Sequence, residues 1–279
     1  MRLSPLILIA NVLFSLTGCV AGAHAPQQAV SPAAVTAAPA PVTAAPDQTA
    51  ASQFAPSPDG GAYLAPLSLN LYRLLPPPPE AGSAQERAEL DQLLSIQANR
   101  TPAQARRALD DSHVDIFRFS DALGSPPRFN ASQLPLTTAL FARIGKDESA
   151  YMDGAKDAFG RPRPFVTDRR LQPVVPQPPS ASYPSGHSTW AVACAIVLSD
   201  MVPERRAQIF ARADEYAYNR EVGGVHYPSD VAAGRLAGTA LAASLFQTPR
   251  FLNDEVAATA ELRAALGLPP LPRHQRYRH

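Results

Sequence analysis

The sequence predicts an all-α fold, a compact helical bundle preceded by a disordered tether. Beyond residue 84, apolar residues recur at helical spacing in one segment after another, whereas strand-like alternation and hairpin turn signals are scarce. Residues 20–62 are instead mostly Ala, Pro, Thr, Ser and Gln, with Asp47 and Asp59 as the only Asp, Glu, Lys or Arg among them. Such a segment buries too little apolar surface to offset its chain entropy, so we expect a semi-extended tether.

The expected helices follow from periodicity and from start and stop signals. Leu90, Leu93 and Leu94 give the first helix one apolar face. Thr101-Pro102-Ala103-Gln104 is typical of a helix start, with Thr as the N-cap and Gln three residues later, and Gly267 is typical of a helix stop. The expected helical ranges are 84–99, a helix from residue 102, 134–144, 188–201, 203–218, 229–245 and 253–266.

Two features predict how these elements pack. The helix 229–245 carries small residues that permit a close helix–helix approach, namely Ala232, Ala233, Gly234, Ala237 and Gly238. The proline run 76–79 cannot form a helix and is expected to lie on the domain as an extended, polyproline-type arm.

The N-terminus resembles an export signal. A basic Arg2 precedes an apolar run over residues 6–16 that is too short to span a membrane comfortably. Leu16-Thr17-Gly18-Cys19 then resembles a bacterial lipobox, in which the cysteine becomes the acylated first residue; the alternative is cleavage after Ala23-His24-Ala25. We therefore expect an exported, periplasmic protein that meets the membrane only through a lipid anchor on Cys19. Because Val20 is not Asp, the outer membrane is favoured.

This interpretation predicts four parts: a lipoprotein-type signal peptide (1–18), a disordered linker (19–62), a globular domain (63–267) and a flexible tail (268–279). The second cysteine, Cys194, lies in an apolar run and is expected to be a small core residue. The formal net charge of +1 argues against a nucleic-acid-binding protein, which usually carries a basic excess.

Three segments carry groups suited to chemistry on an anion. They are Lys156 with Arg163-Pro164, then Pro184-Ser185-Gly186-His187, then Arg220, His226 and Asp230. Three cations suit the oxygens of a phosphoryl group. Ser185-Gly186 precedes a predicted helix, whose free N–H groups favour an anion. We expect Lys156, Arg163, Ser185, Gly186 and Arg220 to bind phosphate.

The two histidines in these segments are expected to do different work. Asp230 lies four residues after His226, so its carboxylate can fix one ring nitrogen and leave the other free to attack. His187 has no acid at such a spacing and is better suited to donate a proton to a leaving alkoxide. Both histidines and Asp230 are therefore the catalytic candidates.

Each segment alone is weak evidence. A single Pro-Ser-Gly-His is a short turn, and an Arg–His–Asp string is most often a capped helix with a surface histidine. Their joint occurrence, in this order and spacing, favours a site. Zinc is a weak alternative because three cations would crowd a metal, so no metal ligand is assigned. No role is assigned to the remaining histidines, His24, His113, His274 and His279.

These segments resemble the signature of the type 2 phosphatidic acid phosphatase superfamily, which includes vanadium-dependent haloperoxidases. The likeness covers roughly residues 65–260 and is strongest to bacterial class A nonspecific acid phosphatases. It extends to Leu75-Pro76-Pro77-Pro78-Pro79-Glu80-Ala81-Gly82-Ser83, to Gly154-Ala155-Lys156 and Arg163-Pro164-Phe165, to Ser182-Tyr183-Pro184-Ser185-Gly186-His187, to Arg212-Ala213-Asp214-Glu215 and to Ser229-Asp230-Val231.

The resemblance implies a helical, often oligomeric phosphatase acting on small phosphate monoesters without a cofactor or metal. It implies that His226 forms a phosphohistidine, with Asp230 orienting it and His187 as general acid, and that phosphotransfer to alcohols accompanies hydrolysis. Asn219, where relatives usually have Ser, and Tyr227, where they commonly have Trp, depart from the pattern.

Three alternatives remain open at this point. The same pocket can hold vanadate and activate peroxide, which would make the chain a haloperoxidase. A tether near lipid head groups suits a lipid phosphate phosphatase. A noncatalytic phosphate-binding lipoprotein is disfavoured by the complete pair of histidines.

Overall fold

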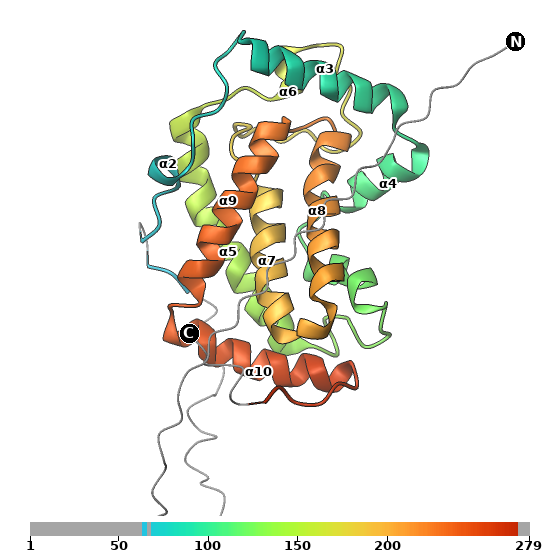
Figure 1. Ribbon diagram of the computed structural model, residues 1–279, viewed down its shortest axis with the longest axis vertical. Helices are drawn as coiled ribbons and strands as arrows, with labels where there is room; N and C mark the ends of the chain where they lie inside the picture. Colours follow the sequence, from blue (N-terminus) through green and yellow to red (C-terminus); the bar gives the residue numbers. More distant parts are fainter. Residues whose placement is uncertain (1–62, 66–67, 273–279) are drawn as a thin grey trace, which may run out of the picture. The chain divides into compact units, whose positions relative to one another are not determined.

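The computed structural model describes residues 63–65 and 68–272. The expected signal peptide, the lipobox at Cys19, the linker 19–62 and the end of the tail, residues 273–279, lie outside the described residues. All regular structure in the described part is helical, which confirms the predicted all-α fold (Figure 1). In chain order the elements are α2 (Leu71–Leu74), α3 (Ala84–Asn99), α4 (Pro102–Asp110), η1 (Ile116–Phe119), η2 (Asp121–Leu123), α5 (Pro135–Phe159), α6 (Pro164–Thr167), α7 (Gly186–Met201), η3 (Pro203–Arg205), α8 (Arg206–Val222), α9 (Pro228–Leu245) and α10 (Pro249–Ala265).

Helix α7 is the centre of the bundle. It is apolar on nearly every side, which is the pattern of a fully buried helix, and it packs against α5, α8 and α9. Cys194 lies on it with no exposed surface, as expected for a core residue. Helix α10 packs against α5 and α7 and crosses the ends of the other helices in Figure 1.

Two glycines bring α9 very close to α7. A Cβ atom on Gly234 would lie less than 3.0 Å from the carbonyl oxygen of Ser185, and one on Gly238 would lie equally near that of Thr189. No L side chain fits at such a distance from backbone atoms, so the predicted close packing of this small-residue helix is confirmed.

Local end signals placed several helix boundaries correctly. Helix α3 spans the predicted 84–99, and α4 begins at Pro102 with Thr101 and Gln104 in the predicted capping box. The proline arm is extended after Leu75, and the carbonyl of Pro76 accepts a hydrogen bond from the Tyr183 hydroxyl. The arm therefore lies on the domain, as expected.

Other boundaries were wrong. Helix α5 was expected to end at residue 144 but continues to Phe159, where Gly160 adopts φ 60° and ends it. Helix α8 runs four residues beyond the expected end at 218, and α10 begins at Pro249 rather than near residue 253. The short α2 was not expected. Helix α5 continues through Gly145, where an added Cβ would lie 3.8 Å from the indole nitrogen of Trp190 on α7.

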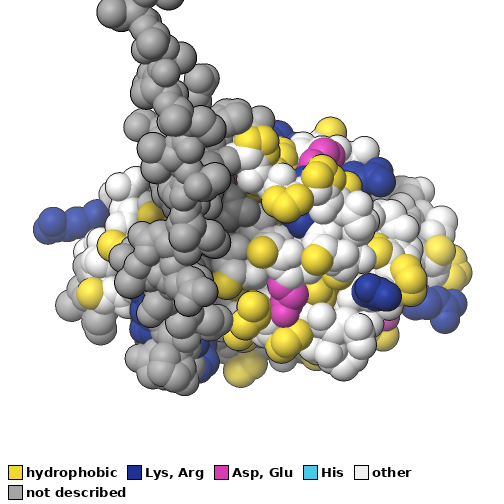
Figure 2. All heavy atoms as spheres, turned by 90° about the horizontal axis from the view of Figure 1, so that it is seen from below, with side chains coloured by type: hydrophobic (Ala, Val, Ile, Leu, Met, Phe, Trp, Pro, Cys, Tyr) yellow, Lys and Arg dark blue, Asp and Glu magenta, His cyan; other side chains and the backbone are white. Residues whose placement is uncertain are grey.

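The surface differs from the core in its mixture of side-chain types. On the face visible in Figure 2, hydrophobic side chains are dispersed among charged and polar groups. No helix among the described residues is both long and apolar enough to cross a membrane.

Candidate active site

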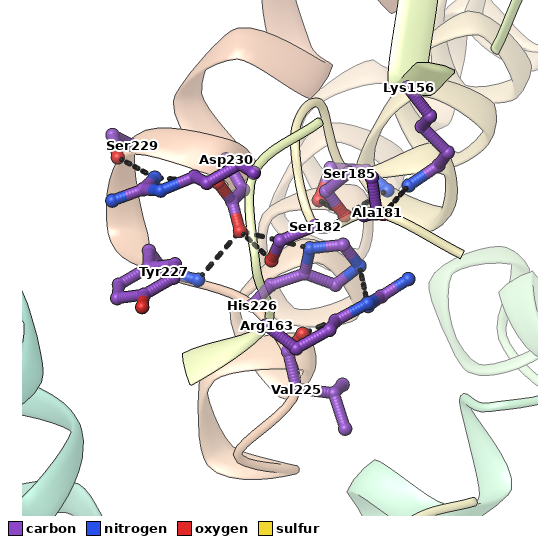
Figure 3. Close-up of polar contacts among 12 residues, drawn as sticks. Lys156, Arg163, Ala181, Ser182, Ser185, Val225, His226, Tyr227, Ser229 and Asp230 are labelled. Carbon is purple, nitrogen blue, oxygen red and sulfur yellow. Dashed lines mark hydrogen bonds and ion pairs between the residues drawn. The ribbon is translucent and has the colours of Figure 1, made fainter. Parts of the chain in front are cut away.

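The three chemical segments come together at the ends of five helices. Lys156 lies in the last turn of α5, Arg163 precedes α6, Ser185 caps α7, and Arg220 lies in the last turn of α8. His226 is in the loop before α9 and Asp230 is in the first turn of that helix. Figure 3 shows Lys156, Arg163, Ser185, His226 and Asp230 around one small volume.

The imidazole of His226 is held by Asp230. Nδ1 of His226 lies 3.2 Å from Oδ2 of Asp230, the contact predicted from their spacing of four residues. The same Oδ2 accepts hydrogen bonds from the backbone N–H of Tyr227 at 2.9 Å and from the hydroxyl of Ser182 at 2.5 Å. Asp230 is completely buried, so these donors replace the water that its carboxylate loses.

The other ring nitrogen of His226 faces a cation. Nε2 lies 2.9 Å from Nη1 of Arg163. Because a guanidinium only donates, Nε2 must be the acceptor, and the ring proton is therefore on Nδ1, facing Asp230. The histidine thus presents a lone pair, not a proton, toward the guanidinium of Arg163.

The three predicted cations are all buried beside this ring. Burial lowers the pKa of Arg163 and of Arg220 to about 10, and burial together with Arg163 lowers that of Lys156 to about 8. Lys156 donates to the carbonyl of Ala181 at 2.8 Å, and Arg163 to those of Ser180 and Val225, each at 2.9 Å.

Arg220 is different from the other two cations. It is 1% exposed, and neither its Nε nor its Nη1 has a hydrogen-bond partner among the described residues. A buried guanidinium with unused donors is costly unless an anion satisfies it. This orphaned pair of donors indicates an anion-binding position.

The cations also set the charge state of His226. Burial, followed by Arg163, Lys156, Arg220 and His187, holds the pKa of His226 well below its usual value. The ring is therefore neutral, and its Nε2 lone pair accepts the hydrogen bond from Arg163.

His187 occupies the first turn of α7 and is fixed by the loop after α4. Its Nε2 donates to the carbonyl of Ser112 at 3.0 Å, and its ring stacks on Tyr216. Burial and then Arg220 lower the pKa of His187 to about 3, while the hydrogen bond to Ser112 works in the opposite direction. A bound dianion would offset the nearby positive charge and raise this pKa.

Ser185 and Gly186 form the start of α7. The hydroxyl of Ser185 accepts hydrogen bonds from the N–H and the hydroxyl of Ser188, and its backbone N–H donates to the Asp230 carbonyl at 3.0 Å. A Cβ atom on Gly186 would lie 2.7 Å from Oε1 of Glu148 on α5. The glycine therefore makes room for a buried carboxyl group that the sequence did not single out.

Four residues that contact the predicted site residues were not predicted from the sequence to belong to the site: Arg161, Ser182, Ser112 and Glu148. Arg161 lies between Lys156 and Arg163, and its charge within that segment could have marked it as a candidate site residue. Nothing in the sequence indicated its contact with Asp230. Ser112 and Glu148 come from elements distant in sequence and carried no signal at all. None of the described residues forms a cluster of three or more His, Cys, Asp or Glu suited to a metal ion.

The two departures from the expected pattern lie behind the site. Tyr227 is buried beneath the guanidinium of Arg161, with its hydroxyl on Thr167. Asn219 donates to Asp111, which also pairs with Arg212. Both side chains contribute to the packing around the cationic residues and contact neither histidine by a hydrogen bond.

A cavity of about 600 Å³ lies beside Glu148, and none of the eight predicted site residues lines it. Glu148 and Trp190 line it together with Val114, Ile116, Phe117 and Phe141. It is bounded by the segment that follows Ser112, so the loop that holds His187 also forms a wall of the cavity.

Comparisons with known proteins agree with this geometry. The model of the PAP2 superfamily matches residues 135–254, from the start of α5 into α10, a stretch that contains all eight predicted catalytic and phosphate-binding residues. A non-specific acid phosphatase of Salmonella typhi is 28% identical over 204 residues, 70% of this chain and 81% of that protein. An acid phosphatase of Zymomonas mobilis is 31% identical over 202 residues, 68% and 75% of the two chains. A solved bacterial vanadium-dependent iodoperoxidase matches with a TM-score of 0.48 and 18% identity, covering 62% of this chain and 51% of that one.

Proposed function

Because the chain belongs to the PAP2 superfamily and is an acid phosphatase, we propose that it hydrolyses a broad range of small phosphate monoesters through a phosphohistidine on His226. The observation that carries this proposal is the neutral ring of His226, which offers its Nε2 lone pair toward Arg163 while Nδ1 is held by Asp230. A nucleophile of this kind needs an oriented tautomer and an electrophile held nearby by cations.

Binding of the phosphate is the first step. The unused donors of Arg220, together with Arg163 and Lys156, neutralise the two charges of the phosphoryl group. At the N-terminus of α7 the backbone N–H of Gly186 adds a donor, whereas that of Ser185 is already bonded to the Asp230 carbonyl. Arg163 transfers a hydrogen bond from Nε2 of His226 to a phosphate oxygen, which frees the lone pair.

Chemistry then takes two displacements at phosphorus. Nε2 of His226 forms a bond to phosphorus as the ester P–O bond breaks, and His187 gives a proton to the departing alkoxide. Asp230 stabilises the positive charge that develops on the imidazole. Water then attacks the phosphohistidine, gives a proton to His187 and releases phosphate; an alcohol in place of water yields phosphotransfer.

The test is hydrolysis of p-nitrophenyl phosphate by the purified chain at acidic pH with EDTA present. We expect release that survives EDTA and is lost in His226→Ala, together with a ³²P-labelled phosphoenzyme that only the wild type forms. His113→Ala is the matched control, because His113 is an exposed histidine.

Each contrary result has a definite meaning. Equal release by His226→Ala would remove this residue from the nucleophilic role. Absence of release by the wild type would contradict phosphomonoester hydrolysis, and peroxide-dependent halide oxidation with vanadate would then identify the haloperoxidase alternative.

Location is the remaining part of the proposal. We propose export and acylation at Cys19, with the linker 19–62 holding the catalytic domain 63–267 away from the outer membrane. Metabolic labelling with a fatty acid, lost in Cys19→Ala, tests it; cleavage after Ala25 would instead give an unlabelled mature chain.

A further inference from the structure

Arg161 is a buried arginine that touches the Asp230 carboxylate on the side away from His226. Its Nη1 donates to Oδ1 of Asp230 and to the hydroxyl of Ser229, both at 2.7 Å. Its Nη2 pairs with Glu89 of α3 at 3.0 Å. The guanidinium carbon of Arg161 also lies 3.7 Å from the ring centroid of Tyr227. The guanidinium is therefore held by hydrogen bonds along its edge and by the Tyr227 ring against its face.

The two oxygens of Asp230 are thereby given different partners. Oδ1 accepts from Arg161, and Oδ2 accepts from His226, Ser182 and the N–H of Tyr227. A carboxylate rotated about its Cβ–Cγ bond would lose this set of contacts. Arg161 therefore fixes the orientation of the carboxylate plane relative to the histidine, although it does not itself face the reacting ring nitrogen.

The charge of Asp230 depends on the same contact. Burial raises the pKa of this carboxyl, and Arg161 is the strongest of the groups that oppose the rise, ahead of Ser182 and Tyr227. The other titratable or charged groups around Asp230 are Lys156 on α5, Arg163 before α6, Tyr183 before α7, Glu221 on α8, His226 and Tyr227 before α9, and Glu89 on α3.

We propose that Arg161 is a positioning residue of the reaction: its ion pair with Oδ1 keeps the Asp230 carboxylate ionised and turned so that Oδ2 accepts the Nδ1 proton of His226. This inference rests on the proposed phosphohistidine mechanism. It assigns a role to a residue that touches neither the phosphate nor the ring, and it makes α3, through Glu89, part of the support of the catalytic pair.

Loss of Arg161 should act in a way that depends on pH. Without the cation, Asp230 takes up a proton at a higher pH than in the wild type. A protonated carboxyl no longer requires a donor at Oδ2, so the Nδ1–H tautomer of His226 loses its support. Activity is then lost first on the acidic side, and the acidic limb of the pH profile moves to higher pH.

The experiment compares Arg161→Met, Arg161→Lys and the control Arg170→Met. Arg170 is an exposed arginine of the same region that pairs with Asp168. We measure kcat and KM for p-nitrophenyl phosphate from pH 4 to 8, and inhibition by inorganic phosphate. For Arg161→Met we expect kcat to fall at least about tenfold and the acidic limb to rise by about one pH unit or more. The inhibition constant for phosphate should stay within about threefold of the wild-type value, because the proposed phosphate-binding cations are unchanged.

The other variants separate charge from structure. Arg161→Lys keeps the positive charge, so its acidic limb should stay near that of the wild type even though kcat falls. Arg170→Met should match the wild type. Arg161→Met alone leaves the buried carboxylate of Glu89 without its ion-pair partner. The double variant Arg161→Met with Glu89→Gln removes this charge and replaces the single variant in the experiment if that variant fails to fold.

Three results would overturn the proposal. If kcat falls while the acidic limb of the pH profile does not move, Arg161 is a structural residue only. If inhibition by phosphate weakens by the same factor as kcat falls, the whole pocket has collapsed. A readout without turnover keeps this separate from the proposed function: ¹⁵N NMR of the histidine rings, assigned with His226→Gln, should show His226 protonated on Nδ1 in the wild type and mixed in Arg161→Met. An unchanged tautomer would contradict the inference even if no phosphatase activity were found.

Discussion

Arg163 donates a hydrogen bond to Nε2 of His226 at a distance of 2.9 Å. This ring nitrogen is the nucleophile of the proposed mechanism. Before substrate binds, the lone pair is therefore occupied, and the same guanidinium is one of the proposed ligands of the incoming phosphate. In the proposed mechanism, phosphate binding and activation of the nucleophile are one event, because the phosphate that attracts Arg163 also releases the ring nitrogen.

Arg163→Met should weaken both parts of this exchange. We expect inhibition by inorganic phosphate to weaken by roughly tenfold or more, since a hydrogen bond to a charged group contributes about 1.5–3 kcal/mol. Arg163 is also the first of the cations that lower the pKa of His226, so its removal raises that pKa and protonates the ring at a higher pH than in the wild type. Phosphate inhibition and the pH profile of kcat/KM check the two effects, and a variant with unchanged inhibition would exclude Arg163 from the phosphate site.

His187→Asn should discriminate between leaving groups. The p-nitrophenolate ion leaves without much help, whereas an alkoxide needs the proton that we assign to His187. We expect kcat for an alkyl phosphate such as glycerol phosphate to fall by roughly 10² or more, and the fall for p-nitrophenyl phosphate to be much smaller. Equal losses on both substrates would argue for a role in binding. His113→Ala again provides the exposed control.

Glu148→Gln should change how stability depends on pH. Burial raises the pKa of Glu148 to about 8 from 4.5. Between these pH values the folded chain holds a proton that the unfolded chain has released, so the free energy of unfolding falls as pH rises through this window. Glutamine stays neutral throughout. The variant should therefore gain stability relative to wild type from pH 5 to pH 8, on the order of a few kcal/mol at most.

Thermal unfolding at several pH values checks this expectation. The exposed Glu80→Gln is the control and should differ from wild type by the same amount at each pH. The neighbouring Lys156, whose pKa burial lowers to about 8, contributes its own change above that window and is present in both proteins. A stability difference that is constant between pH 5 and 8 would show that Glu148 is ionised in the folded chain.

Two glycine-to-alanine changes should have opposite signs. A Cβ on Gly238 would collide with the backbone carbonyl of Thr189, which should cost about 1–3 kcal/mol of stability or more. Gly154 is also within a helix, but a Cβ there meets nothing within 4 Å, so Gly154→Ala should stabilise the chain by about 0.5–1 kcal/mol. Denaturant unfolding measures both, and a neutral Gly238→Ala would mean that α7 and α9 can move apart.

The parts of the fold that were predicted well depend on neighbouring residues. The capping box of Thr101 and Gln104 and the bounds of the helix 84–99 depend on signals within a few residues, and both were placed correctly. The end of α5 was not, because the helix continues past Gly145 and packs against α7 and α10, which are far away in the sequence. Local patterns therefore locate helices but do not decide where packing extends them.

The same limit applies to the site. The contact between His226 and Asp230 followed from a spacing of four residues, and the structure has it at 3.2 Å. The contact between Arg161 and Glu89 joins residues 72 positions apart, and no spacing rule connects them. Residues that hold an active site in place are drawn from the whole fold, whereas the reacting groups lie in short recognisable segments.

The close approach of α7 and α9 also determines how the molecule opens. At Gly234 and Gly238 the backbone of α9 lies directly against that of α7, just beyond Ser185. Amide hydrogens in this pair should exchange with deuterium only when the domain unfolds as a whole, and more slowly than those of the short α2. We therefore expect the proposed reaction to take place at the end of the most slowly exchanging helix pair, while local opening is confined to the outer helices.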